Sequence, residues 1–555
     1  MQNEKLATIV VFVTLSGGLV TPIIFGELYP VTNIWFTAGI LGLILLALND
    51  TKLGQTVWLY LSCIITLAVA YRLRIFLFPA SMIGQDPDTY AIQIARVVEA
   101  GETSVITFGF YKQAPLHTLE GTITGLITAL PAPVASVVYP ISGGIAIPLV
   151  AASLAYRLRP DTPETTVLVT GVVSVLGYGT RFSYWPVAQS TGVLFLLFTL
   201  ASIFAYANAG GKRWLILGIL TTLGAVYTHK LSAVATTLSV TGAMLLGIVH
   251  PATRRSNEVK RLVTGAFLII ALLTAVQLLF LTGFIRAIVF QLYRPSISSI
   301  PPSNPRLAID PYTLTDRIFA LSYVILMGLI SGLVWLGLCW QTVRNRGPPR
   351  DILFLGFIFP LAALVIALYP AGVNPVRTIF YVEVLLAVLI AVGGCWVVVE
   401  SADSFRPFAR YAAVAGILVL VVSAGMSPTA GPDWDTLNRN YLTAEEVEAK
   451  EWGHDKVSRT IVTDQYYASE TVPSRISSIG SGGESGSAQF DYPLGYYIYA
   501  KFLNGESRMI AHRGCLDILR TSIGPMKLAY EPSNIFDSRH SKIYNSGCVH
   551  YYKTG

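Results

Sequence analysis

The sequence predicts an all-α polytopic membrane bundle of about thirteen transmembrane helices, followed by a C-terminal extracytoplasmic α/β domain. Three observations support this fold class. Apolar residues make up 53% of the chain and charged residues only 13%, whereas soluble domains carry about 25% charged residues. The apolar residues gather in runs of about 20, the length that a helix needs to cross the hydrocarbon core. Short loops that carry Lys or Arg alternate along the chain with loops that carry few or none.

The apolar runs are too long for barrel strands, and lipid accepts only helices and closed barrels. We therefore expect helices. The expected spans lie near residues 6–25, 31–48, 55–78, 132–156, 164–182, 186–208, 213–229, 231–249, 262–284, 318–342, 352–370, 377–398 and 409–426.

Short loops rich in Lys and Arg predict orientation, because such loops stay in the cytoplasm. With a cytoplasmic N-terminus, every expected inner loop carries a basic residue, for example Lys52 and Arg157, whereas the 25–31 turn carries none. Segments 79–131, 285–317 and 427–555 then lie outside. The net charge of +7 follows from these loops, so we expect membrane lipid and no nucleic acid as a partner.

Two domains follow: a transmembrane domain over 1–426, with an outside loop at 79–131, and a soluble domain over 427–555. Within the loop, the pattern of residues 88–99 predicts a short helix on the membrane surface, and residues 116–130 predict a second helix. In the tail, Thr443 with Glu446 forms a capping-box pattern. Cys515 and Cys548 face an oxidising compartment, where a disulfide is one possibility.

The first candidate site is the pair Asp86 and Asp88, in the sequence Gly84-Gln85-Asp86-Pro87-Asp88-Thr89-Tyr90. Carboxylates just outside a span can act as a general base or hold a divalent cation such as Mg²⁺ or Mn²⁺. The alternative is that Asp88 caps the following helix. The pattern leaves both open.

The same outside loop carries Tyr111, Lys112 and His117, in the stretch Tyr111–His117. These residues place a cation and an imidazole near the acidic pair and are candidates for substrate or phosphate binding. An ordinary interfacial turn is the alternative.

Basic residues at the outer ends of spans form the third group. They are Arg72, Arg74, Arg181, His229 with Lys230, and Arg377. Charges at such positions mark functional sites, and a lipid-linked phosphate would need cations there. Snorkelling to headgroups is the alternative for each one. Glu383 is an alternative partner for Arg377.

These motifs resemble the C-type glycosyltransferase superfamily, membrane enzymes that take a sugar from a polyprenyl-phosphate donor. The resemblance is carried by Gly84-x-Asp86-x-Asp88 with Tyr90, Tyr111–His117, Thr228–Ser232, Asn374–Arg377, and Glu445–Trp452 with Ile461–Asp464. Within the superfamily, the chain is most similar to archaeal dolichol-phosphate-mannose mannosyltransferases, which extend the N-glycans of surface-layer proteins. Two extra spans precede the acidic loop, and no WWDxG-type motif of the oligosaccharyltransferases is present.

The resemblance implies inverting transfer of a single sugar, with mannose expected, from dolichyl or polyprenyl phosphate to a lipid-linked or protein-linked glycan. Asp86 is the first choice for the base and Asp88 the second. Arg181, Lys230 and Arg377 are the expected phosphate ligands. A divalent cation is left open, because some relatives use a metal and others do not.

Two other function classes remain. A transporter or flippase of lipid-linked sugars would share the spans and the outer cations, but it would favour paired broken helices, and no internal repeat is evident. A membrane scaffold with a partner-binding tail would not need several charges at the outer ends of its spans.

Overall fold

The computed structural model describes residues 2–25, 30–74, 85–106, 109–177, 187–249, 257–280, 308–309, 314–344, 349–368, 375–400, 406–425, 441–458, 460–464, 467–468, 490–491, 509–515, 518–521, 524–528 and 532–554. All statements about structure below concern these residues.

Each expected span overlaps a helix, and residues 75–78, 178–182, 186, 281–284, 369–370 and 426 of the expected spans lie outside the described residues. The helices are α1 (Gln2–Phe25), α2 (Pro30–Leu48), α3 (Leu53–Leu73), α7 (Val138–Leu158), α8 (Pro163–Val175), α10 (Ala188–Ala209), α11 (Lys212–Thr228), α12 (Lys230–Val249), α13 (Asn257–Phe280), α15 (Leu314–Val343), α16 (Pro349–Leu368), α17 (Pro375–Glu400) and α18 (Arg406–Gly425).

Within the described residues, seven segments are long and apolar enough to cross a membrane. They are α1, α2, α3, Ala132–Leu158, α10, α12 and α15. α8 was expected over 164–182, but it ends at Val175 and has only 13 residues. The chain is thus a helical membrane protein, and thirteen spans remain a prediction.

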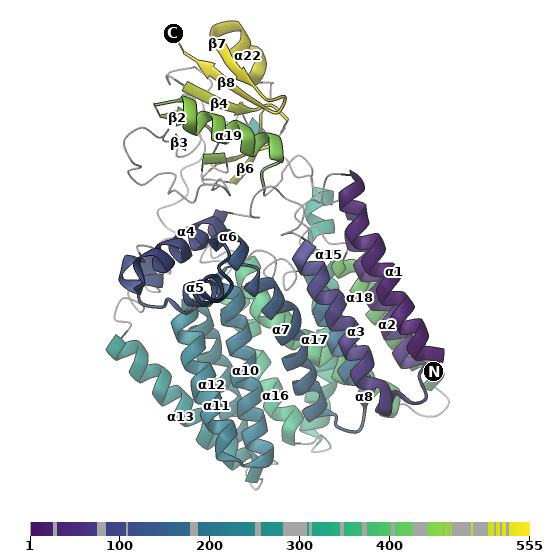
Figure 1. Ribbon diagram of the computed structural model, residues 1–555. Coiled ribbons are helices and arrows are strands. Elements are labelled where there is room, and N and C mark those ends of the chain that lie inside the picture. The colour runs from purple at the N-terminus through teal and green to yellow at the C-terminus, as the bar shows by residue number, and fades with distance from the viewer. Residues whose placement is uncertain are drawn as a thin grey trace.

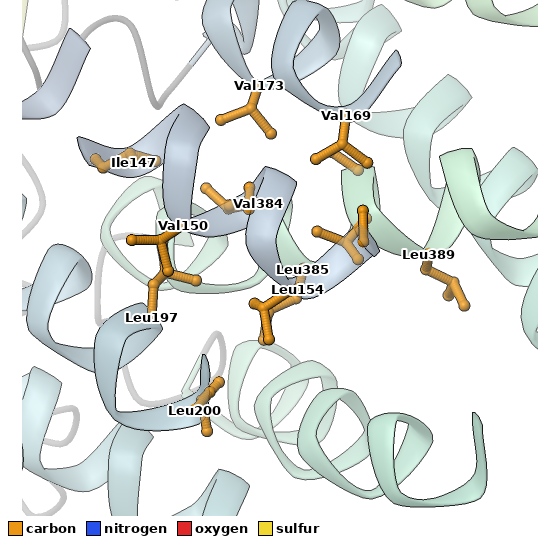
Figure 2. Close-up of a cluster of buried hydrophobic side chains, with 14 of the residues drawn as sticks. Ile147, Val150, Leu154, Val169, Val173, Leu197, Leu200, Val384, Leu385 and Leu389 are labelled. Carbon is orange, nitrogen blue, oxygen red and sulfur yellow. The ribbon is translucent and has the colours of Figure 1, made fainter. Parts of the chain in front are cut away.

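The centre of the bundle is an apolar core formed by α7, α8, α10 and α17. Its side chains point toward one another from these four helices (Figure 2). The labelled members, each at most 5% exposed, are Ile147, Val150, Leu154, Val169, Val173, Leu197, Leu200, Val384, Leu385 and Leu389. Outer faces are also apolar: Phe12 on α1 and Leu333 on α15 are each 71% exposed. Such faces suit contact with lipid.

Basic residues of the expected inner loops gather at one end of the bundle. Both guanidinium Nη atoms of Arg159, which follows α7, donate to the Asp351 carboxylate at the start of α16, at 2.8 Å each. The Arg157 guanidinium lies 5.0 Å from the ring centroid of Trp214 on α11. These contacts place the loop after α7 beside the starts of α11 and α16.

The opposite end carries α4 (Gln85–Ala100), η2 (Thr103–Val105), η3 (Gly109–Lys112), α5 (Leu116–Thr128) and α6 (Ala132–Ala135). Figure 1 shows α4, α5 and α6 lying across this end of the bundle, on the side of the C-terminal strands. The apolar face of α4 is buried: Ala91 and Ile94 are 0% exposed. This face packs on α5 and α6, and the placement of α4 at the membrane surface stays a prediction. α5 exposes apolar side chains, with Ile127 79% exposed.

The tail forms an α/β unit. A five-stranded sheet has the order β3 (Phe490–Asp491), β2 (Ile461–Val462), β4 (Met509–Arg513), β8 (Val549–Lys553) and β7 (Ser541–Asn545). β2 is parallel to β3 and β4, whereas β8 is antiparallel to β4 and β7. Two helices accompany the sheet, α19 (Ala444–Lys456) and α22 (Pro532–Arg539).

Local tail predictions can be compared directly. The capping box is confirmed: the Glu446 backbone N–H donates to Thr443 Oγ1, and the Thr443 N–H donates to the Glu446 carboxylate. Cys515 and Cys548 form a disulfide.

A second sheet joins the expected outside segment 285–317 to the tail. Its order is β1 (Ala308–Ile309), β6 (Gly524–Leu528) and β5 (Ile518–Thr521). β1 is antiparallel to β6, with Ala308 opposite Leu528. Residues 308–309 of the expected outside segment therefore lie beside residues 527–528 of the tail.

Candidate functional site

The acidic pair lies in the first turn of α4. Pro87 is tolerated there because the first backbone N–H groups of a helix have no partner within it. Since α4 begins at Gln85, the capping interpretation of Asp88 is wrong. Asp88 is 1% exposed. The side chain of Asp86 is outside the described residues, and its backbone places it one residue into the helix. Carboxylates are stabilised in this first turn by the helix dipole.

A continuous series of ring contacts brings three of the predicted site residues together. The His117 ring stacks on Tyr139, with centroids 4.0 Å apart, and meets the edge of Tyr90 at 4.6 Å. Tyr90 contacts Tyr111 at 5.4 Å, and Tyr111 lies 6.4 Å from His229. We call these five residues the aromatic row. The row connects α7, α5, α4, η3 and the α11–α12 junction at one end of the bundle.

His229 occupies a sharp break between two helices. α11 ends at Thr228, α12 begins at Lys230, and His229 between them has an extended backbone. Its Nδ1 accepts the Leu231 backbone N–H at 3.2 Å. The imidazole proton is therefore assigned to Nε2, which makes Nε2 the donor of the ring. Lys230 is half-buried beside it.

A hydroxyl pair holds the same junction against α17. Tyr381 OH lies 3.2 Å from His229 Nδ1 and 2.7 Å from Ser232 Oγ. The backbone of α10 approaches closely at Gly192, where an added Cβ would come within 1.9 Å of Ser232 Oγ. Glycine at this position is thus required for α10 to pack on the junction.

Sequence reasoning missed a polar group beneath His117. The Thr191 hydroxyl on α10 donates to Glu120 Oε2 at 2.9 Å and lies 3.0 Å from His117 Nδ1. Burial raises the pKa of Glu120 to about 7, and the Thr191 hydrogen bond only partly opposes this. The available signal was the spacing of His117 and Glu120, three residues apart in an expected helix and therefore on one face.

Two of the basic residues at the outer ends of spans, Arg72 and Arg74, are buried between helices. Arg72 donates to the carbonyls of Ala68 and Ser174, and Arg74 donates to Asn33 Oδ1. Both guanidinium groups are 1% exposed. Both side chains therefore join helices of the bundle.

For two other predicted cations, Arg181 and Arg377, the side chain lies outside the described residues. Arg181 is outside the described residues. Arg377 lies in the first turn of α17, with its side chain outside them. Its suggested alternative partner, Glu383, accepts the Tyr323 hydroxyl at 2.9 Å. Lys112 is exposed and next to Tyr111, so Lys112 and Lys230 are the described cations that flank the aromatic row.

The sequence left a divalent cation open, and the side chain of Asp86, one of its two expected ligands, lies outside the described residues. Among the described residues, no group of three or more His, Cys, Asp or Glu side chains is placed to hold a metal ion. Of the expected pair, they supply only the buried carboxylate of Asp88. No step below is routed through a metal.

No protein-family model matches the chain, and no curated protein matches it. Solved structures of the Archaeoglobus fulgidus oligosaccharyltransferase do match. The apo form has a TM-score of 0.51 at 11% identity, over 81% of this chain and 69% of that one. This chain has the C-type glycosyltransferase fold.

Two further oligosaccharyltransferase structures from Archaeoglobus fulgidus agree. The complex with an inhibitory peptide and a dolichol-phosphate has a TM-score of 0.51 at 11% identity, over 82% of this chain and 69% of that one. The complex with Zn and sulfate has a TM-score of 0.50 at 12% identity, over 81% and 67%. At such identities the likeness concerns the fold alone.

Proposed function

We propose that the protein is an inverting membrane glycosyltransferase that uses a polyprenyl- or dolichyl-phosphate sugar. The observation that carries this proposal is that several candidate site groups lie together at one end of a C-type fold. The acidic start of α4, the aromatic row and the His229–Lys230 junction share one end of the bundle, and the tail lies on the same side. The dolichol-phosphate bound by the similar archaeal enzyme supports a lipid-phosphate donor.

The donor would lie with its lipid between helices and its phosphate at this end. Lys230 and Lys112 flank the aromatic row, and Arg181 and Arg377 are proposed as further phosphate ligands. His229 fits the same task because its Nε2 carries a proton that can be donated to a phosphate oxygen. These groups would stabilise the negative charge that develops on the leaving phosphate.

The reaction requires one proton acceptor. An acceptor hydroxyl oxygen forms a bond to the anomeric carbon, the bond from that carbon to the phosphate oxygen breaks, and the hydroxyl proton passes to a carboxylate. Asp86 remains the first choice, because Asp88 is 1% exposed and an external acceptor must reach its base. Displacement from the face opposite the phosphate inverts the sugar.

The finer assignment is a proposal as well. We propose mannose as the sugar, an N-glycan (lipid-linked or on a glycoprotein) as the acceptor, and the outer face of the cell membrane as the location. The N-terminus would then be cytoplasmic and the tail domain extracytoplasmic. The shared end of the basic loops supports this orientation.

The test uses the purified full-length protein in liposomes, with radiolabelled polyprenyl-phosphate mannose and a lipid-linked oligosaccharide acceptor. Wild-type protein should move label to the acceptor, and Asp86→Asn should lower the rate at least about 100-fold, in line with the usual contribution of a general base. Asp88→Asn, measured at equal folded protein, is the matched comparison. Label that crosses the bilayer without joining an acceptor would instead identify a flippase.

A further inference from the structure

Glu120, Thr191 and His117 form a connected polar group that the proposed chemistry has not yet used. α5 places His117 and Glu120 on one face, and Thr191 of α10 lies between their side chains. The two oxygen atoms Thr191 Oγ1 and Glu120 Oε2 are 2.9 Å apart, and Thr191 Oγ1 is 3.0 Å from His117 Nδ1. His117 is 0% exposed and Thr191 is 4% exposed, so the protein screens this group from water.

A hydroxyl has a single proton, and this fact couples the two ionisable groups. When Glu120 is ionised, it accepts that proton, so the Thr191 oxygen must accept a proton from His117 Nδ1. When Glu120 is protonated, its O–H can donate to the Thr191 oxygen. The hydroxyl proton then turns toward Nδ1, which must be unprotonated, and the imidazole proton resides on Nε2. The protonation state of Glu120 therefore selects the tautomer of His117.

The ring contacts of His117 connect its tautomer to the position of α4. Its ring stacks on Tyr139 and meets the edge of Tyr90, which lies two residues after Asp88 on α4. Its backbone carbonyl accepts the Tyr139 hydroxyl, and that hydroxyl accepts the Gly121 N–H at 3.1 Å. The imidazole thus contacts the helix that carries both candidate bases.

We propose that Glu120, acting through Thr191, is a positioning residue that sets the tautomer of His117 and thereby the active arrangement of α4. The inference rests on the proposed glycosyl transfer. We take ionised Glu120, accepting from Thr191, as the active state; the 2.9 Å between the two oxygens fits donation in either direction. Transfer should therefore increase as pH rises through the pKa of Glu120, which is about 7.

Other charged or titratable groups could contribute to such a profile. The elements packed against α5 are α4, α6, α7, α10 and α11. The titratable and charged groups on these elements toward this end are Asp86, Asp88, Tyr90, Arg96, Glu99, Tyr139 and Tyr227, and neighbouring described segments add Glu102, Tyr111, Lys112, His229 and Lys230. Those groups remain in the variants below, so only a change specific to Glu120 or Thr191 supports the proposal.

The first experiment follows the turnover rate kcat from pH 5.5 to 8.5 in liposomes. Wild type should lose about 10-fold in kcat from pH 8 to pH 6, as expected for one group with a pKa of about 7. Glu120→Gln, whose amide oxygen can accept the Thr191 proton at every pH, should lose this slope. Thr191→Val should lower kcat at all pH values with KM for the donor unchanged, and Thr191→Ser should restore the slope.

Thr199→Val is the matched control. It removes a buried hydroxyl of the same helix that instead donates to Thr221 Oγ1 at 3.1 Å, so the slope should remain. A slope that survives in Glu120→Gln would overturn the proposal. If wild type transfers no sugar at any pH, the proposed function has failed.

A second measurement does not depend on activity. Nitrogen NMR of protein labelled in its seven histidines should contain one ring that exchanges its Nδ1–H and Nε2–H forms as pH crosses 7. This signal should vanish in His117→Phe and become independent of pH in Glu120→Gln. A His117 signal with one unchanging tautomer from pH 5.5 to 8.5 would refute the inference even in an active enzyme.

Discussion

Glu120→Gln should make the folded protein less sensitive to alkaline pH. Burial raises the pKa of Glu120 from its ordinary 4.5 to about 7. Below pH 4.5 the carboxyl is protonated in both the folded and unfolded states. Above pH 7 it is ionised in both, and the folded state then bears the cost of a buried charge. The stabilising contribution is therefore present at low pH and is lost as pH rises through about 7.

The size of the effect follows from the same values. Each unit of pKa corresponds to 1.36 kcal/mol, so a rise from 4.5 to about 7 gives at most about 3 kcal/mol. Gln cannot ionise and keeps an acceptor for the Thr191 hydroxyl. The free energy of unfolding of Glu120→Gln, relative to wild type, should therefore increase by up to about 3 kcal/mol between pH 4.5 and pH 8.

The assay is reversible unfolding of the purified protein in detergent at a series of pH values, with Glu99→Gln as a control. Glu99 is an exposed carboxyl on α4, so its removal should leave the wild-type dependence in place. Parallel curves for wild type and Glu120→Gln would refute the reasoning, since they would mean that Glu120 ionises alike in both states.

Three other changes test the packing. Asp351→Asn should cost about 3 kcal/mol of stability, because it leaves the Arg159 guanidinium without its bidentate partner; a thermal midpoint equal to that of wild type would contradict this. Arg513→Met should cost about 4 kcal/mol, because Glu446, 3.0 Å from Arg513 Nε, is 0% exposed; unchanged protease resistance of the tail would argue against it. Cys548→Ser should cost about 4 kcal/mol, since its disulfide spans 33 residues; a tail that unfolds at the same denaturant concentration with and without reductant would exclude that role.

Much of the bundle could be predicted because its signals are local. An apolar run of span length is visible in the sequence alone, and every expected span fell on a helix. The capping box at Thr443 is equally local. The end of α8 at Val175 is local too, because Gly177 and Gly179 follow it, but the length of the apolar run outweighed that signal in the prediction.

The site was only partly predictable because its contacts are distant in sequence. Tyr111, His117 and His229 were chosen by residue type, and the structure joins them through Tyr90. Glu120 was missed because its importance depends on Thr191, 71 residues away.

The partners of Arg72 and Arg74 could not be predicted for a related reason. Both look unpaired in sequence, but Asn33 and the Ser174 carbonyl, which accept their hydrogen bonds, come from other helices. The pairing of Ala308 with Leu528 is likewise invisible locally, because a two-residue strand has no periodicity of its own.

The central claim is that a polyprenyl-phosphate sugar binds at the end of the bundle that carries α4 and the aromatic row. The most direct measurement is photo-crosslinking of the full-length protein in liposomes with a diazirine-bearing polyprenyl-phosphate mannose, followed by peptide mapping. The account predicts crosslinks within residues 85–117 and 227–232 that unlabelled donor displaces. Crosslinks confined to the opposite end, around Arg157, Arg159 and Trp214, or crosslinks that donor does not displace, would contradict it.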